Sequence, residues 1–129
     1  MRYFDAATIR ARLPWPRMLD AIDAMLKDDV AAPLRANHSI DVPGEPAASL
    51  LLMPAWRAGQ RIGVKLVTVF PGNRERGQRA VNAVYALFDA RNGEPLALFD
   101  GDEITARRTA GASAYAARFL ARRDAKHLV

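Results

Sequence analysis

The sequence predicts one α/β (α+β) domain in which helices stand at both ends of the chain and strands fill the middle. Apolar residues recur at helical spacing near the start and near the end, whereas runs rich in β-branched and aromatic residues lie between them. A hairpin signal, Asn92-Gly93, separates two of these runs. The chain has 129 residues, 50% of them hydrophobic, which suffices for one domain with a modest core.

Two helices are predicted at the start of the chain. Asp5 is a good N-cap for a helix over residues 6–13, which Pro14 closes. Pro16 suits the first turn of a second helix. One apolar stripe runs along the second helix, and we expect it to pack in the core; its members are Met18, Ile22, Met25 and Leu26.

Strand-like patterns joined by turn residues occupy the middle of the chain. In the first, alternation places Arg35 on a polar face, where a solvated arginine is the ordinary interpretation. Pro54 stops the second strand, and the last two form a hairpin across Asn92-Gly93. The predicted strands are residues 32–42, 49–53, 62–70, 80–89 and 95–100.

Lys65 lies in the middle of the predicted strand over residues 62–70, which reads as largely buried. Burying an ammonium group without a partner is costly, so this lysine must reach an edge, solvent or an anion. An edge lysine that limits aggregation is the alternative to a binding role. The residues of this strand alone leave both interpretations open.

A long helix is predicted from Ile104 to residue 122, with Gly101-Asp102-Glu103 as its cap. Arg107 and Arg108 fall near its start, where the macrodipole opposes positive charge, and an anion bound at that end would make both favourable. One narrow face is suited to close packing on a sheet; it consists of Thr109, Ala112, Ser113, Ala116, Phe119 and Leu120.

The net charge of +5 invites a nucleic-acid interpretation, but the charge distribution argues against it. The basic residues gather in residues 57–79 and 107–126, where acids are interleaved and no stacking aromatics alternate with them. Small anionic molecules fit these clusters better than nucleic acid does.

Several classes of site are excluded by composition. The chain has no cysteine, so it can form neither a disulfide nor a thiol site, and it shows no metal-ligand spacing, phosphate loop, G-x-G-x-x-G fingerprint or catalytic triad. The first residues lack the apolar core of a signal peptide, and no segment approaches the ~18 apolar residues of a membrane span. We expect a cytoplasmic protein with no membrane partner.

Five short motifs follow one another along the chain: Leu52-Met53-Pro54, Gly63-Val64-Lys65, Phe70-Pro71-Gly72-Asn73, Arg76-Gly77 and Thr105-Ala106-Arg107-Arg108-Thr109-Ala110. Together they resemble the N-terminal part of the ornithine cyclodeaminase/μ-crystallin family. The resemblance implies a mixed β-sheet with flanking helices that serves substrate binding and dimerisation over residues 1–123. It also implies a homodimer, and a Rossmann domain that begins at residues 124–129 and is cut short.

The resemblance further implies that a small anionic amino or imino acid is held through its carboxylate by Arg35, Lys65 and Arg108. Arg108 and Thr109 would contact the cofactor, NAD or NADP in the full-length protein, and no cofactor is expected for the fragment alone. The family's catalytic aspartate lies in the missing part, so the catalytic residue is unknown. An anionic substrate would account both for a lysine in a buried strand and for an arginine near a helix start.

Two departures from the family pattern matter, the first for the reaction and the second for the cofactor contacts. Members that cyclise ornithine carry a glutamate where Leu51 stands, and many members carry a threonine that contacts the nicotinamide end where Ala80 stands. We therefore expect an NAD(P)-dependent reductase of cyclic imino acids such as pyrroline-2-carboxylate or piperideine-2-carboxylate. Ornithine cyclodeaminase, which converts ornithine to proline and ammonia, is the alternative within the family. A non-catalytic small-ligand-binding or dimerisation module is the alternative of another class, and the fragment alone is expected to be inactive.

Overall fold

The computed structural model describes residues 1–122 and 124–126, and its centre is a six-stranded sheet in the order β1-β6-β5-β4-β3-β2. Strand β1 is parallel to β6, and the remaining neighbours are antiparallel, which confirms the mixed sheet. The elements are β1 (Arg2–Phe4), α1 (Ala6–Arg12), α2 (Trp15–Leu26), β2 (Ala36–Ile40), β3 (Ala48–Arg57), β4 (Arg61–Val69), the 3₁₀ helix η1 (Pro71–Arg76), β5 (Val81–Asp89), β6 (Pro95–Asp100) and α3 (Gly101–Leu120).

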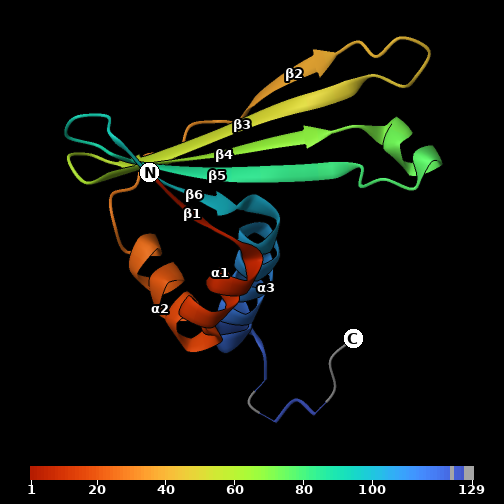
Figure 1. Cartoon of the computed structure of the whole chain (residues 1–129). Helices are drawn as coiled ribbons and strands as arrows, with labels where there is room; N and C mark the ends of the chain where they lie inside the picture. The colour runs from red at the N-terminus through yellow and green to blue at the C-terminus, as the bar shows by residue number, and fades with distance from the viewer. Residues whose placement is uncertain (123, 127–129) are drawn as a thin grey trace.

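All three α-helices lie together on one side of the sheet, and β2, β3 and the η1 end project beyond them (Figure 1). The helices pack on β4, β5 and β6. None of the helices that the structure describes has the length and apolarity needed to cross a lipid bilayer. Of residues 124–129, where the resemblance places the start of a Rossmann domain, residues 127–129 lie outside the described residues.

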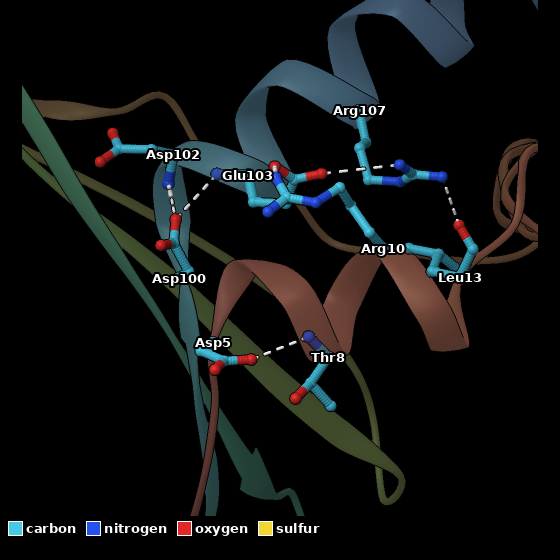
Figure 2. Close-up of polar contacts among 8 residues, drawn as sticks. All are labelled: Asp5, Thr8, Arg10, Leu13, Asp100, Asp102, Glu103 and Arg107. Carbon is cyan, nitrogen blue, oxygen red and sulfur yellow. Dashed lines mark hydrogen bonds and ion pairs between the residues drawn. The ribbon is translucent and has the colours of Figure 1, made fainter.

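The two N-terminal helices form as predicted. The main-chain N–H of Thr8 donates a hydrogen bond of 2.8 Å to Asp5 Oδ1, which caps α1 (Figure 2). On α2, Met18 and Ile22 are buried where the helix crosses Gly111 of α3, but Met25 is 46% and Leu26 61% exposed. The predicted stripe is therefore core only in its first half, because α3 covers α2 only around that crossing.

Strand β3 continues through Pro54, so the predicted stop at this residue is wrong. Trp56 exchanges both main-chain hydrogen bonds with Ala31, at 2.9 and 3.0 Å, and the nitrogen of Pro54, two residues earlier, faces the same edge. Strand β2 begins only at Ala36, opposite Leu52. The nitrogen of Pro54 therefore faces a part of the β3 edge where the described residues form no main-chain hydrogen bond. The lack of an N–H group at Pro54 costs no hydrogen bond there.

Strand β1 is an element that the sequence pattern did not reveal, since three residues are too few to show a period. Strand β2 is shorter than predicted, so Arg35 lies just before it. The turn after β4 is a 3₁₀ helix that ends at Gly77 with φ of 66°. At the distal end of the sheet, Arg76 of this helix forms an ion pair with Glu45 of the β2–β3 connection.

Helix α3 begins three residues earlier than predicted, at Gly101. Its N-cap is Asp100, whose Oδ1 accepts hydrogen bonds from the N–H groups of Asp102 and Glu103 at 3.0 and 2.9 Å (Figure 2). Arg107 and Arg108 therefore lie in the second turn, beyond the reach of the macrodipole. The expectation of an anion at this helix start is wrong, because an aspartate already caps it.

The buried face of α3 is not the predicted one. Arg107 and Gly111 are buried, whereas Phe119 is 70% and Leu120 84% exposed. A Cβ at Gly111 would lie 3.0 Å from Ile22 Cδ1, so the glycine lets α2 approach closely. The alanines of the helix are all exposed, and the side that carries Arg107 and Gly111 is the one that α2 approaches.

The sheet has two unequal faces. The helix-side face carries Lys65, Tyr85 and Phe99, and the open face carries the alternating residues, among them Leu66 and Val84. Leu66 and Val84 are Cα partners that are 41% and 43% exposed. The predicted burial of the central strand β4 therefore holds for one face and is wrong for the open face.

Candidate functional site

Lys65 lies at the centre of the sheet, in β4, with Met53 of β3 and Tyr85 of β5 as its Cα partners. These three side chains therefore form one row on the helix-side face. The lysine is half-buried. Because β4 has a neighbouring strand on each side, the interpretation of Lys65 as an edge lysine is wrong.

The structure brings Arg35, Lys65 and Arg108 together. The pKa of Lys65 is lowered, first by burial and then by the positive charges of Arg108 and Arg35. Arg35 reaches the site from the segment before β2, beside Met53, and Arg108 reaches it from the second turn of α3. These three residues, drawn from three separate parts of the chain, form what we call the cation cluster.

No carboxylate within the described residues forms an ion pair with a member of the cation cluster. Other arginines of the chain do have such partners: Arg57 lies 2.6 Å from Asp28 Oδ2, and Arg79 lies 2.8 Å from Asp102 Oδ2. Three neighbouring positive charges repel one another, and a bound anion removes that repulsion. The cluster therefore has the charge and the donors needed to bind a carboxylate.

Arg107, the neighbour of Arg108, has a different role. It is 8% exposed, donates a hydrogen bond of 2.6 Å from Nη2 to the carbonyl oxygen of Leu13, and lies 3.5 Å from Glu103 (Figure 2). Its guanidinium group also lies 4.4 Å from the centroid of the Trp15 ring. Arg107 therefore joins α3 to the α1–α2 connection, whereas Arg108 is exposed.

The remaining residues of interest lie around the cluster. Thr109 is exposed on α3, and its carbonyl oxygen accepts a hydrogen bond of 3.2 Å from Ser113. No described contact joins Thr109 to the cation cluster. Leu51 pairs with Val67, so it stands on the helix-side face one row from Lys65. The position where ornithine-cyclising relatives carry a glutamate is therefore close to the cluster and apolar in this chain.

Sequence reasoning missed Tyr85, which stands directly opposite Lys65. A Cβ at Gly63 would lie 1.8 Å from the hydroxyl oxygen of Tyr85, so the tyrosine ring crosses β4 over that glycine. Burial raises the pKa of Tyr85, and the described residues provide no hydrogen-bond partner for its hydroxyl. An isolated glycine inside a β-branched strand was the available signal, because it indicates a close approach.

The comparisons with known proteins identify the family of the chain. The profile of the ornithine cyclodeaminase/mu-crystallin family matches residues 17–129. The chain belongs to this family. Its resemblance to the family by motif and its predicted fold class are thereby confirmed.

Members of the family with named activities are among the relatives. The chain is 43% identical over 79 residues to the Delta(1)-pyrroline-2-carboxylate reductase of Bacillus cereus, a match that covers 60% of the chain and 24% of that enzyme. The structure of the Thermococcus litoralis Delta(1)-pyrroline-2-carboxylate reductase in complex with NADH and L-proline is similar with a TM-score of 0.81 and 29% identity, over 98% of the chain and 40% of that protein.

A probable ornithine cyclodeaminase from Bordetella pertussis is similar with a TM-score of 0.76 and 27% identity, over 95% of the chain and 37% of that protein. The matched parts of the chain therefore cover between 24% and 40% of the length of these three relatives. Both reactions expected from the motifs occur among the names of the relatives.

Proposed function

We propose that the chain is the substrate-binding and dimerisation part of an NAD(P)-dependent reductase of cyclic imino acids, of the pyrroline-2-carboxylate or piperideine-2-carboxylate type. The observation that carries this proposal is the cation cluster, in which Arg35, Lys65 and Arg108 meet without a carboxylate partner among the described residues. A small anionic substrate accounts for all three. The similarity to a reductase bound to NADH and L-proline supports the substrate class.

In this proposal the cluster binds and orients the substrate. Lys65 contacts the carboxylate from β4, Arg35 from the segment before β2, and Arg108 from the second turn of α3. Charge-assisted hydrogen bonds to one carboxylate fix the rest of a small ring in a single orientation. A dinucleotide would supply the hydride, and Arg108 and Thr109 are the residues of this chain that we propose contact it.

The turn that binds the pyrophosphate of a dinucleotide is a separate feature, and we propose that it lies in a further domain. None of the eight glycines stands in a Gly-rich turn from a strand into a helix, the arrangement that a pyrophosphate needs. We propose that residues 1–123 form the substrate domain and that residues 124–129 begin a Rossmann domain that carries NAD or NADP. The NADH-bound relative supports NAD.

Reduction is favoured over cyclodeamination by the residue at position 51. Leu51 stands one row from Lys65 on the same face, so an ionisable group for the leaving amine is absent from this position. Ornithine cyclodeaminase remains the second candidate, because a probable enzyme of that kind is among the similar structures.

We also propose that the open face pairs with a second copy of the chain. Tyr3 is 67% exposed, and Leu66 and Val84 are 41% and 43% exposed on this face. Exposed apolar side chains gathered on one sheet face are typical of an interface, and identical copies most often pair about a two-fold axis.

Titration of the purified chain with L-proline, followed by nuclear magnetic resonance, tests the cation cluster. We expect Lys65→Met and Arg108→Gln each to weaken binding by about tenfold or more, because each removes a charge-assisted contact. Arg118→Gln is the matched control, since Arg118 is exposed on the same helix, about 15 Å farther along. Equal binding by all three variants would contradict the proposal.

A longer protein that joins this chain to its dinucleotide-binding domain separates the enzymatic from the non-catalytic candidates. With NADH and pyrroline-2-carboxylate, we expect oxidation of NADH that depends on Lys65. Binding of L-proline without any turnover of the imino acid would favour a non-catalytic binding module. Release of ammonia from ornithine would favour cyclodeamination.

A further inference from the structure

Tyr85 is held in place from two sides on the helix-side face. Its ring packs edge-on against Phe99, with the ring centroids 6.1 Å apart and the planes at 67°. Phe99 in turn stacks on Phe4, at 5.0 Å and 12°. Phe4, Phe99 and Tyr85 therefore form an aromatic row from β1 through β6 to β5. The next strand, β4, carries Lys65.

Gly63 provides the space that the tip of Tyr85 occupies. A Cβ at this position would lie 1.8 Å from the tyrosine hydroxyl oxygen and 2.7 Å from Cζ, so any larger residue would displace the ring. Gly63 is two residues from Lys65 on β4, about 7 Å along the strand. The ring of Tyr85 therefore extends from a position opposite Lys65 toward Gly63, and its hydroxyl lies on the same face of the sheet as the lysine.

If Lys65 binds the carboxylate of a small molecule, the rest of that molecule must lie over the residues next to Lys65 on the neighbouring strands. These are Met53 and Tyr85, whose Cβ atoms are each about 5 Å from that of Lys65. Met53 is flexible and adapts to different shapes. Tyr85 is confined by Phe99 and the backbone at Gly63, so it presents a fixed surface together with a hydroxyl that has no partner among the described residues.

We propose that Tyr85, seated against Gly63, is a specificity-determining residue of the cation cluster, and that its ring and hydroxyl limit the size of the ring that a bound cyclic carboxylate can have. This inference rests on the proposed function, because it takes the cluster as the carboxylate site. Burial keeps the hydroxyl protonated near neutral pH, so it can donate a hydrogen bond to the ligand.

The test compares ligands that differ by one methylene group. The dissociation constants of L-proline and L-pipecolate are measured for the wild-type chain and for Tyr85→Phe, Gly63→Ala and Tyr115→Phe by nuclear magnetic resonance. Tyr115→Phe is the matched control, because it removes a hydroxyl that donates to Asp23 on the helical side of the molecule. Circular dichroism checks the fold of each variant.

We expect the ratio of the L-pipecolate to the L-proline dissociation constant to fall about threefold in Tyr85→Phe, which frees the space of one oxygen atom. In Gly63→Ala the added methyl group drives the ring toward the ligand, and we expect the ratio to rise by about the same factor. If Tyr85 had a purely structural role, its substitution would weaken the binding of both ligands equally, and the ratio of their dissociation constants would not change.

Unchanged ratios in both variants, with binding that still depends on Lys65, would overturn this inference and leave the proposed function intact. If Gly63→Ala does not fold, the ratio for Tyr85→Phe decides alone. If binding of L-proline does not depend on Lys65 in the wild-type background, the proposed function fails, and this inference fails with it.

Discussion

The guanidinium carbon of Arg107 lies over the Trp15 ring, 4.4 Å from its centroid. The same group donates to the carbonyl oxygen of Leu13 and pairs with Glu103, so one side chain connects α3 to the segment between α1 and α2. The adjacent Arg108 is exposed and has no such contacts among the described residues. The two consecutive arginines therefore have different roles: Arg107 is structural, and Arg108 is available to a ligand.

We expect Arg107→Gln to lower the free energy of unfolding by about 1–3 kcal/mol, because it weakens the hydrogen bond to the carbonyl oxygen of Leu13 and leaves Glu103 with Arg10 as its remaining ion-pair partner. Arg108→Gln should change it by less than about 0.5 kcal/mol, as for most surface positions. Urea denaturation of both variants provides the measurement. Equal losses would contradict the division of roles.

Lys65→Met should leave the chain as stable as the wild type or more stable. The substitution removes a partly desolvated charge that two arginines repel, and it adds an apolar side chain of similar length. Thermal unfolding of the ligand-free proteins is the measurement. A loss of several kcal/mol would show that Lys65 belongs to a structural ion pair instead of a binding site.

The stability of the wild type relative to Lys65→Met should increase as the pH rises toward 10.5, the ordinary pKa of lysine. The folded state lowers the pKa of Lys65, so at alkaline pH the unfolded chain binds more protons than the folded chain does, and stability rises with pH. Below the lowered pKa both states are fully protonated, and the cost of burying the charge is fully present. Urea midpoints of both proteins at pH 8, 9 and 10 test this, and a wild type that falls further behind Lys65→Met as the pH rises would contradict it.

The chain should associate through the open face. Light scattering over a range of concentrations should give a mass that falls toward the monomer on dilution, and Leu66→Glu should favour the monomer because it places a charge in an apolar interface. Leu34→Glu is the control, since Leu34 is 97% exposed outside the sheet. A monomeric mass at all concentrations would disprove dimerisation through this face.

The isolated chain should bind NADH or NADPH only weakly and should not turn over imino acids. The reason is that its glycines do not form the turn in which a pyrophosphate sits. Calorimetric titration with each nucleotide measures this. A dissociation constant in the micromolar range would overturn the assignment of the dinucleotide site to a further domain.

Several features could be predicted from the sequence because each depends on neighbouring residues. Asp5 caps α1 as its spacing from Thr8 requires, and Asn92-Gly93 turns β5 into β6. The order of helices and strands follows from local periodicity. The family and the members of the cation cluster followed from motifs, which do not require knowledge of packing.

Other features depend on residues that are distant in the sequence, and only the tertiary structure decided them. The close approach of α2 at Gly111 buries the side of helix α3 that carries Arg107 and leaves Arg108 exposed. Pro54 is tolerated within β3 because β2 begins only at Ala36, opposite Leu52. The sequence alone determined that Lys65 is an unusual residue in a strand. The pairing of β4 with β5 and the position of α3 decided that two arginines and Tyr85 surround it, because these contacts join segments separated by many residues.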